Sequence, residues 1–332
     1  MRKIKIAQIG INQYSHSIEV LTSIAKQTDL FEVVGYALPE GEKDRIPKKY
    51  EKLQNYKELT LDEILKDPQI EAVTIETDER HLTKYALLAA KAGKHIHMEK
   101  PGGEDPEEFA ELIRVMKQTG KVLHIGYMYR YNPEIHTLMQ RIKNGQLGEI
   151  VSVEAQMNSD HSDELRTYLS NFKGGIMFFL GCHLIDLILQ LQGMPKRILP
   201  MNKSTGKAGI NVIDYGMVMF EYDTGISFAK TCSVEKGGYA RRQLVVTGTK
   251  GTVELKPLEM NSGTTRKYTG VTEWLVDDPA WSYIGEKRNS EPYDRYDDMM
   301  RAFAQMVTGE IINPYSLGYE LTLYQTILTS CQ

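Results

Sequence analysis

Short apolar segments alternate with helical patterns in the first 127 residues, and this alternation constrains the fold more than any other feature. The apolar segments have the length of buried strands and lie at 3–9, 31–37, 70–77, 94–98 and 121–127. Amphipathic helical spacing separates them at 15–27, 61–66, 79–92 and 106–118. Strands that alternate with helices predict a doubly wound parallel sheet, which binds ligands at the carboxyl ends of its strands.

The pattern changes after residue 127. A helix is predicted from Asn132 to near Gly145, a strand at 149–158 and a long apolar helix at 174–193. Further elements follow, with strands at 212–221, 225–234, 241–247 and 252–256 and helices near 295–308 and 316–331. Residues 258–295 have little periodicity and predict a long irregular segment.

The length of 332 residues favours two domains over one hydrophobic core. We therefore predict an α/β protein with a nucleotide-binding domain at 1–126 and a second domain at 127–332. The second domain is expected to hold an open, mainly antiparallel sheet with helices on one face.

Composition argues against several classes of partner. A formal net charge of −4 gives no basic surface for nucleic acid or for an anionic membrane. The sequence has neither a leader pattern nor an apolar stretch of the roughly 18 residues that a membrane span needs. Cys182, Cys232 and Cys331 form no CxxC pair, which favours a reducing compartment. We expect a cytoplasmic protein.

The first βα turn, in KIAQIGINQYSHSIEV at 5–20, departs from the GxGxxG pattern of dinucleotide-binding turns. Its three positions hold Gly10, Asn12 and Ser15. Gly10 can form the tight turn, and Asn12 is expected to displace the phosphates or to contact them itself. Ser15 either donates its hydroxyl to the cofactor or caps the helix. Leu38 stands at the end of the second strand, where an acidic residue that binds the adenosine ribose is expected. The residues of the first turn and Leu38 alone therefore leave dinucleotide binding open.

The stretch AGKHIHMEKPGG, at 92–103, places Glu99 and Lys100 at the carboxyl end of a buried strand. An unpaired buried ammonium group is costly, so Lys100 is expected to face the ligand cleft or to reach solvent from the strand end. Pro101 fixes the following turn and allows a cis bond before it.

The stretch GGIMFFLGCHLID, at 174–186, places His183 and Asp186 on one face of an apolar helix because they are three residues apart. The histidine is either a catalytic group or a core residue that Asp186 satisfies by a hydrogen bond. The pattern alone leaves both interpretations open.

Several motifs together, in their order and spacing, resemble the glucose-fructose oxidoreductase and inositol dehydrogenase (Gfo/Idh/MocA) family. They are the turn at Gly10, Thr77 with His81, the AGKHIHMEKP run, GYMYRYNP at 126–133, the GGxxxxxGxHxxD helix and GTKGTVEL at 248–255. The resemblance covers nearly the whole chain. It implies a Rossmann domain that binds NAD or NADP, and a second domain that covers the nicotinamide and binds a sugar, a polyol or a related hydroxy compound. It also implies homodimers or homotetramers formed through the C-terminal sheet.

The resemblance implies that Lys100 and His183 line the reaction site. Contacts with the cofactor are expected from Gly10, Asn12, Ser15, Thr77, His81, Glu99 and Lys100, and contacts with the substrate from Lys100, Arg130, Phe179 and His183. Oxidation of an alcohol needs a general base for the hydroxyl proton, a task that suits His183. Lys100 is expected to polarise the substrate oxygen or to share the proton. Arg130 either reaches the cleft or caps the following helix.

Phe179 departs from the family pattern, which has an Asp four residues before the histidine. A phenyl ring cannot bind a hydroxyl group or orient a base, so we expect a more apolar pocket and a different substrate from those of the best-known polyol dehydrogenases. His95, His97 and Glu99 alternate on one strand, but the strand is central and His95 belongs to the family's AGKH run, so no metal site is expected.

The leading hypothesis is an NAD(P)-dependent oxidoreductase acting on CH–OH groups. One alternative is a sensor or regulator of sugars or nucleotides that keeps the fold without turnover, which the residues at positions 12, 15, 38 and 179 favour. Another is a glycosidase or lyase that retains its NAD.

Overall fold

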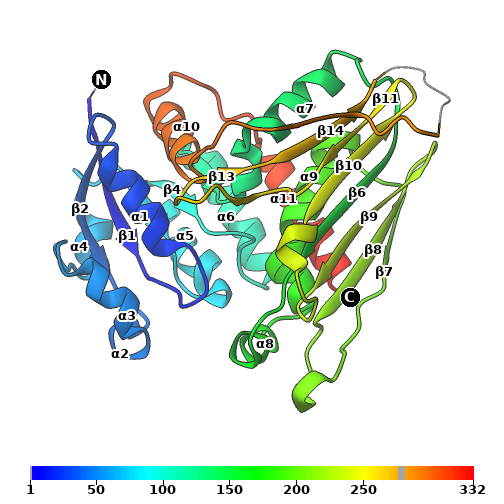
Figure 1. Cartoon of the computed structure of the whole chain (residues 1–332). Coiled ribbons are helices and arrows are strands. Elements are labelled where there is room, and N and C mark those ends of the chain that lie inside the picture. The colour runs from blue at the N-terminus through cyan, green and yellow to red at the C-terminus, as the bar shows by residue number, and fades with distance from the viewer. Residues whose placement is uncertain (1, 276–280) are drawn as a thin grey trace. The chain divides into compact units, whose positions relative to one another are not determined.

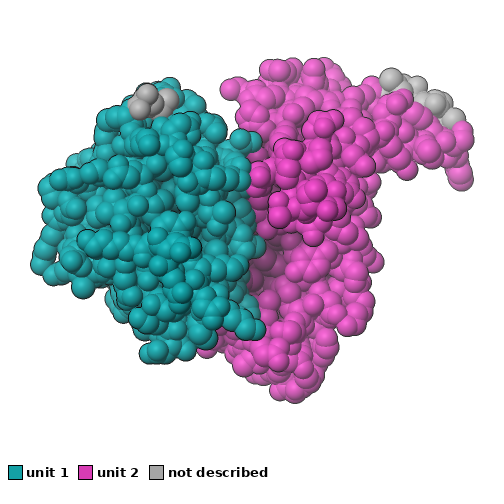
Figure 2. Space-filling model, turned by 60° about the vertical axis from the view of Figure 1, so that its left-hand side comes forward, with its two compact units in different colours: residues 1–127, 296–324 teal, residues 128–295, 325–332 magenta. Residues whose placement is uncertain are grey.

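The computed structural model describes residues 2–275 and 281–332. They form two compact units, coloured separately in Figure 2. The first contains Met1–Tyr127 with Tyr296–Tyr324, and the second contains Met128–Arg295 with Gln325–Gln332. Residues 296–324 thus belong with the first unit although they follow the second in sequence. That 1–126 and 127–332 are separately folding domains stays a prediction.

The first unit is built on a five-stranded parallel sheet with the order β2-β1-β3-β4-β5. The strands are β1 (Ile4–Ile9), β2 (Phe31–Ala37), β3 (Ala72–Ile75), β4 (His95–Met98) and β5 (Leu123–Ile125). The longer connecting helices are α1 (Ser17–Lys26), α4 (Leu61–Lys66), α5 (Leu82–Lys91) and α6 (Pro106–Thr119), as Figure 1 shows. The predicted doubly wound sheet is confirmed.

Local sequence signals set the ends of α6. The Asp105 carboxylate accepts hydrogen bonds from the amides of Glu107 and Glu108 at 2.9 and 3.1 Å, which caps the first turn. Gly120 ends the helix with φ +64°, a left-handed conformation that favours glycine.

Two short helices between β2 and α4 were not predicted: α2 (Glu42–Arg45) and α3 (Pro47–Tyr50), with a 3-10 turn at Glu51–Leu53 after them. Each is too short for a helical hydrophobic period to be recognised. The first unit is completed by α10 (Asp297–Thr308), whose Asp297 accepts a hydrogen bond from the Ser23 hydroxyl of α1 at 2.7 Å. The last helix, α11 (Leu317–Ser330), contains the point at which the chain returns to the second unit.

The second unit is built on an eight-stranded sheet with the order β15-β14-β11-β10-β6-β9-β8-β7. The strands are β6 (Ile150–Asn158), β7 (Arg197–Pro200), β8 (Tyr215–Glu221), β9 (Ile226–Cys232), β10 (Gln243–Gly248), β11 (Gly251–Leu255), β14 (Gly270–Trp274) and β15 (Glu286–Asn289). Among the described strands of this sheet, only the pair β6 and β9 is parallel, so the predicted mainly antiparallel sheet is confirmed. The helices are α7 (Pro133–Lys143), α8 (Asp163–Leu169) and α9 (Cys182–Gln192), and the apolar α9 packs against β6 and β9 (Figure 1).

The segment 258–295 is more regular than predicted. It contains β14 and β15, which extend the large sheet, and a hairpin of β12 (Met260–Asn261) and β13 (Lys267–Tyr268). All four residues of β15 are exposed, so this strand has no buried face and no apolar alternation for sequence analysis to detect. Residues 276–280 of the segment lie outside the described residues.

Candidate active site

The first βα turn meets the end of β3 closely. Gly10 has φ +82°, and a Cβ atom there would lie 2.3 Å from Cγ2 of Thr77. The turn therefore requires glycine for its conformation and for the space. Thr77 is fully buried, and its hydroxyl donates to the carbonyl of Asp78 at 3.3 Å. The structure thus brings together the two predicted cofactor residues Gly10 and Thr77.

The side chain of Asn12 folds onto the protein. Its Nδ2 donates to Oε2 of Glu79 at 2.6 Å, and its Oδ1 accepts from the amide of Tyr14 at 3.1 Å. Asn12 is buried, with 3% exposure. Protein groups thus hold the Asn12 side chain, and a contact between Asn12 and the cofactor stays a prediction.

Ser15 lies next to the start of α1. Its Oγ accepts a hydrogen bond from the amide of Ser17 at 3.3 Å, and His16 occupies the N-cap position. Of the two alternatives for Ser15, the hydrogen bond to the helix start is present, although the residue stands one position before the cap. A contact between Ser15 and the cofactor stays a prediction.

Lys49 of α3 holds this turn, a role that sequence analysis missed. Its Nζ donates to the carbonyl oxygens of Asn12 and Ser15, both at 2.6 Å. Burial lowers the pKa of Lys49, and the carboxylates of Glu19 and Glu76 oppose that shift. The signal was absent because α3 has only four residues and its return to the turn depends on tertiary structure.

Glu99 and Lys100 follow β4, and each is only 6% exposed. Oε1 of Glu99 accepts from the Lys100 amide at 2.8 Å, and the carboxylate also receives a backbone hydrogen bond from His16. Burial raises the pKa of Glu99, whereas the charge of Lys100 lowers it. The peptide bond between Lys100 and Pro101 is cis, as the sequence indicated. Glu99 therefore connects the end of β4 with the start of α1.

Glu76, directly after β3, was not predicted as a site residue. It is fully buried, and neither carboxyl oxygen has a hydrogen-bond partner among the described residues. The nearest ion-pair partner is His97, whose Nε2 lies 3.8 Å from Oε1 of Glu76. Burial, with the nearby charge of Glu99, raises the pKa of Glu76 well above its usual value. An acidic residue at the end of an otherwise apolar strand was the available signal.

His81 lies at the end of the 3-10 turn Glu79–His81 that precedes α5. Its Nδ1 is 3.3 Å from Oε1 of Glu40, which also accepts from the Tyr85 hydroxyl at 2.5 Å and from Nζ of Lys84 at 3.0 Å. The carboxylate nearest to the end of β2 is therefore bound to the start of α5. A contact between His81 and the cofactor stays a prediction.

This edge of the sheet fits a nicotinamide dinucleotide. Gly10 lets the tight turn pack against Thr77, and Lys49 places a cation on the turn itself. The first amides of α1 favour an anion, as helix N-termini do, although the carboxylate of Glu99 already takes the amide of His16. Contacts of Gly10 and Thr77 with the dinucleotide stay a prediction.

His97 forms a buried pair with His124. Their Nδ1 atoms are 2.8 Å apart, and burial lowers the pKa of His97 to about 3. No group of three His, Cys, Asp or Glu residues that could hold a metal ion occurs in the described part of the chain.

Within the residues that the structure describes, every helix is too short or too polar to cross a bilayer.

In the second unit, a wide turn precedes the helix that bears His183. Residues Met177–Gly181 form a π-helix that leads into α9, where sequence analysis predicted one regular helix. A Cβ atom at Gly181 would lie 2.2 Å from Sδ of Met177, so glycine makes room within this turn. Single π turns occur frequently at functional sites. A single π turn within a helix does not produce a recognisable spacing of apolar residues in the sequence. The sequence therefore did not reveal the turn.

His183 is buried in the first turn of α9, with 3% exposure. Its ring contacts the ring of Tyr129 edge to face, with centroids 5.4 Å apart at 76°. Asp186 accepts hydrogen bonds from Nε and Nη2 of Arg130 at 3.0 and 2.8 Å, in an ion pair that is closed to solvent. Asn132, rather than Arg130, caps α7. A contact between Arg130 and the substrate stays a prediction.

Phe179 lies in the π turn and is 6% exposed. Its ring packs against Tyr168 edge to face, with centroids 6.5 Å apart, and Tyr168 packs in the same manner on Phe172 at 5.1 Å. Aromatic rings therefore surround the position where the family has an Asp. Contacts of Phe179 with a substrate stay a prediction. So does the meeting of Lys100 and His183, because the two residues belong to different units.

The fold defines a protein with a Rossmann unit and a second α/β unit built on a mainly antiparallel sheet. A family model described as "Oxidoreductase family, NAD-binding Rossmann fold" matches residues 4–127, and the model of the "GFO/IDH/MocA C-terminal domain" matches residues 135–254. The chain belongs to the Gfo/Idh/MocA family of oxidoreductases, whose Rossmann domain binds NAD or NADP.

Relatives with assigned activities are distant. The chain is 29% identical to scyllo-inositol 2-dehydrogenase (NADP(+)) of Bacillus subtilis over 165 residues, 49% of this chain and 46% of the relative. It is 26% identical to trans-1,2-dihydrobenzene-1,2-diol dehydrogenase of Mus musculus over 220 residues, 66% of this chain and 62% of the relative. The matches thus span less than two thirds of these relatives.

Solved structures share the fold over nearly the whole chain. An aldose-aldose oxidoreductase from Caulobacter crescentus has a TM-score of 0.79 and 17% identity, and covers 99% of this chain and 98% of its own. A 3-ketoreductase from Actinomadura kijaniata, solved with NADP, has a TM-score of 0.79 and 17% identity, with 98% and 96% covered. At this identity the similarity shows the fold alone.

Proposed function

We propose that the protein is an NAD(P)-dependent oxidoreductase that acts on a hydroxyl group of a sugar, a polyol or a related compound. The observation that carries the proposal is the burial of Lys100 and His183 in a fold of this family. Each is less than a tenth exposed, although each bears a titratable group that core packing disfavours. The relatives from Bacillus subtilis and Mus musculus are dehydrogenases, which supports the same reaction class.

In this proposal the nicotinamide ring, when bound, supplies the acceptor or donor of the hydride. His183 takes the proton of the substrate hydroxyl on its imidazole during oxidation and returns it during reduction. Lys100 donates a hydrogen bond from Nζ to the substrate oxygen, which stabilises the charge that develops there. Glu99 positions Lys100, because its carboxylate is bound to the Lys100 amide.

Binding and turnover are tested separately. NADH and NADPH are titrated against the purified protein by fluorescence, and a panel of sugars and polyols is assayed for reduction of NAD or NADP. His183→Ala is expected to keep cofactor affinity and to lose at least 100-fold in kcat, in the range typical of a general base. His136→Ala, on the exposed side of α7, is the matched control. Failure of both dinucleotides to bind at millimolar concentration would contradict the proposal.

A second candidate is a sensor that binds cofactor or sugar without turnover. The hydrogen bond between Asn12 and Glu79 and the aromatic surroundings of Phe179 favour it, since both replace features expected of a working site. Ligand binding without any NADH or NADPH production across the panel would support this candidate, and steady production would exclude it.

We also propose that the protein is a cytoplasmic homodimer or homotetramer assembled through the large sheet. Cys182, Cys232 and Cys331 are buried and form no disulfide within the described residues, which suits a reducing compartment. Sedimentation velocity measures the assembly state, and a monomer at micromolar concentration would contradict this part of the proposal.

A further inference from the structure

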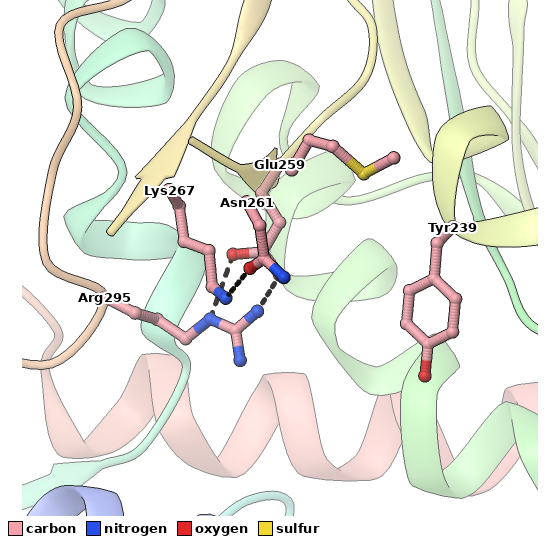
Figure 3. A pocket seen from close by; sticks show the side chains of 6 residues that line it. Tyr239, Glu259, Asn261, Lys267 and Arg295 are labelled. Carbon is pink, nitrogen blue, oxygen red and sulfur yellow. Dashed lines mark hydrogen bonds and ion pairs between the residues drawn. The ribbon is translucent and has the colours of Figure 1, made fainter. Parts of the chain in front are cut away.

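A pocket of about 320 Å³ lies within the second unit, apart from the residues predicted for the site. It is lined by Tyr239, Glu259, Met260, Asn261, Lys267 and Arg295, five of which are labelled in Figure 3. The side chains of Asn261, Lys267 and Arg295 gather on one side, and the Tyr239 ring stands on the other (Figure 3). The volume is at the lower end of the range for small-molecule sites.

The lining carries one more positive than negative charge. Arg295 pairs with Glu259 through two hydrogen bonds, one of them from Nε to Oε2 at 2.9 Å. The ammonium group of Lys267 is bound to the side-chain oxygen of Asn261, a neutral group. Asp294 contributes negative charge near Lys267 but does not line the pocket. The lining therefore presents a cation that no lining carboxylate balances.

The backbone fixes the two cationic residues. Lys267 of β13 pairs with Asn261 of β12, and its amide and carbonyl also bond the backbone of Tyr293 at 2.9 and 2.8 Å. Arg295 follows Tyr293 by two residues, so the same contact places it beside Lys267. Glu259 is only 5% exposed, and its charge is met from the other side by the Tyr129 hydroxyl, which donates to Oε1 at 3.0 Å. The pocket is therefore formed before any ligand binds.

Tyr129 connects this pocket with His183. Its hydroxyl binds Glu259 of the pocket, and its ring lies against the imidazole of His183. One tyrosine side chain thus spans from the proposed base to the charged lining. The lining of the pocket and His183 therefore share one contact residue, Tyr129.

We infer that the pocket binds a carboxylate at one end of the substrate, so that the substrate class is the sugar acids or related hydroxy acids. This inference rests on the proposed function. The ammonium of Lys267 and the guanidinium of Arg295 recognise the carboxylate, since charge-assisted hydrogen bonds are the stronger ones. A single excess positive charge matches a monoanion better than a phosphate dianion. Asn261 and Tyr239 supply neutral polar groups for hydroxyls.

Matched pairs of acids and neutral sugars test the inference by calorimetry: gluconate with glucitol, glucuronate with glucose, and galacturonate with galactose. The titrations use the full chain saturated with NADH or NADPH, which prevents oxidation of the ligand. At least one acid is expected to bind tenfold or more tightly than its neutral counterpart. Lys267→Met is expected to remove this preference, and Arg266→Met, an exposed cation on the same hairpin, is expected to keep it.

Equal affinity for every acid and its neutral counterpart would overturn the inference. So would an acid preference that survives Lys267→Met. Tighter binding of inorganic phosphate than of any acid at this pocket would also overturn it. Binding of an acid that depends on Lys267, without turnover when oxidised cofactor is supplied, would instead contradict the proposed oxidoreductase function and leave the carboxylate pocket standing. Turnover of neutral polyols with unchanged kinetics in Lys267→Met would contradict the pocket and leave the oxidoreductase.

Discussion

Arg130 and Asp186 form a bidentate ion pair whose side chains are 0% and 1% exposed. The pair joins the segment after β5 to the helix that bears His183. Asp186 also accepts a hydrogen bond from Gln190 at 2.7 Å, one turn further along α9. The aspartate of the HxxD motif is therefore engaged by an arginine from the RYNP segment, which explains why both motifs occur in one chain.

Removal of one partner of this pair is expected to be costly. Arg130→Met leaves a buried carboxylate without its cation, which typically lowers the free energy of unfolding by about 3–5 kcal/mol. Arg130→Met with Asp186→Leu is expected to recover most of that loss, because no charge stays buried. Urea unfolding of the single and double variants measures both effects. A loss below about 1 kcal/mol in Arg130→Met would contradict the expectation.

Gly10→Ala is expected to distort the first turn and to impair cofactor binding. The positive φ costs about 1–2 kcal/mol for a residue with a Cβ, and the added atom meets Thr77 at 2.3 Å. Gly145→Ala is the matched control, since Gly145 has φ +72° with no atom within 4 Å of the added Cβ. Fluorescence titration with NADH and NADPH should show at least tenfold weaker binding for Gly10→Ala only. Similar affinities for the two variants would contradict the prediction.

The two architectures could be predicted from the sequence because their signals are local. Alternating strands and helices, the cap at Asp105 and the glycine at position 120 all act within a few residues. The same holds for Gly10, whose conformation is required by its own turn. Local signals of this kind can be recognised in a single sequence.

The rest of the site could not be predicted because it depends on contacts between distant segments. Lys49 reaches the first turn from a four-residue helix, and Tyr129 joins His183 to Glu259 across 130 residues of sequence. The strands of 258–295 were missed for another reason. The residues of β12, β13 and β15 are exposed or half-buried, so the hydrophobic period that reveals other strands is absent there. β14 is largely buried but has only five residues, one of them glycine.

Lys49→Met is expected to weaken cofactor binding about tenfold, or about 1.4 kcal/mol. The variant loses the hydrogen bonds to the carbonyls of Asn12 and Ser15 and the positive charge that favours a phosphate at the turn. Lys48→Met, at an exposed position of the same helix, is the control for loss of a cation. Titrations at low and high salt separate the two contributions, because only the charge is screened. Equal affinities for the two variants would contradict this role of Lys49.

Glu76→Gln is expected to stabilise the protein at neutral pH and to lose that advantage in acid. The pKa of Glu76 is raised in the folded state by burial, so the folded protein binds more protons than the unfolded chain above the ordinary pKa of 4.5. The free energy of unfolding of the wild type therefore falls as the pH rises through that window. The side-chain amide of Glu76→Gln does not titrate. The free energy of unfolding of this variant therefore does not fall with rising pH for that reason.

Urea unfolding at pH 5, 6, 7 and 8 measures the difference between Glu76→Gln and the wild type, which should grow with pH. Glu32→Gln, on the exposed face of β2, controls for loss of a carboxylate elsewhere in the same sheet. Its difference from the wild type should stay constant over this range. A constant difference for Glu76→Gln as well would mean that Glu76 is already ionised in the folded protein, because only a neutral buried acid gives up a proton on unfolding at these pH values.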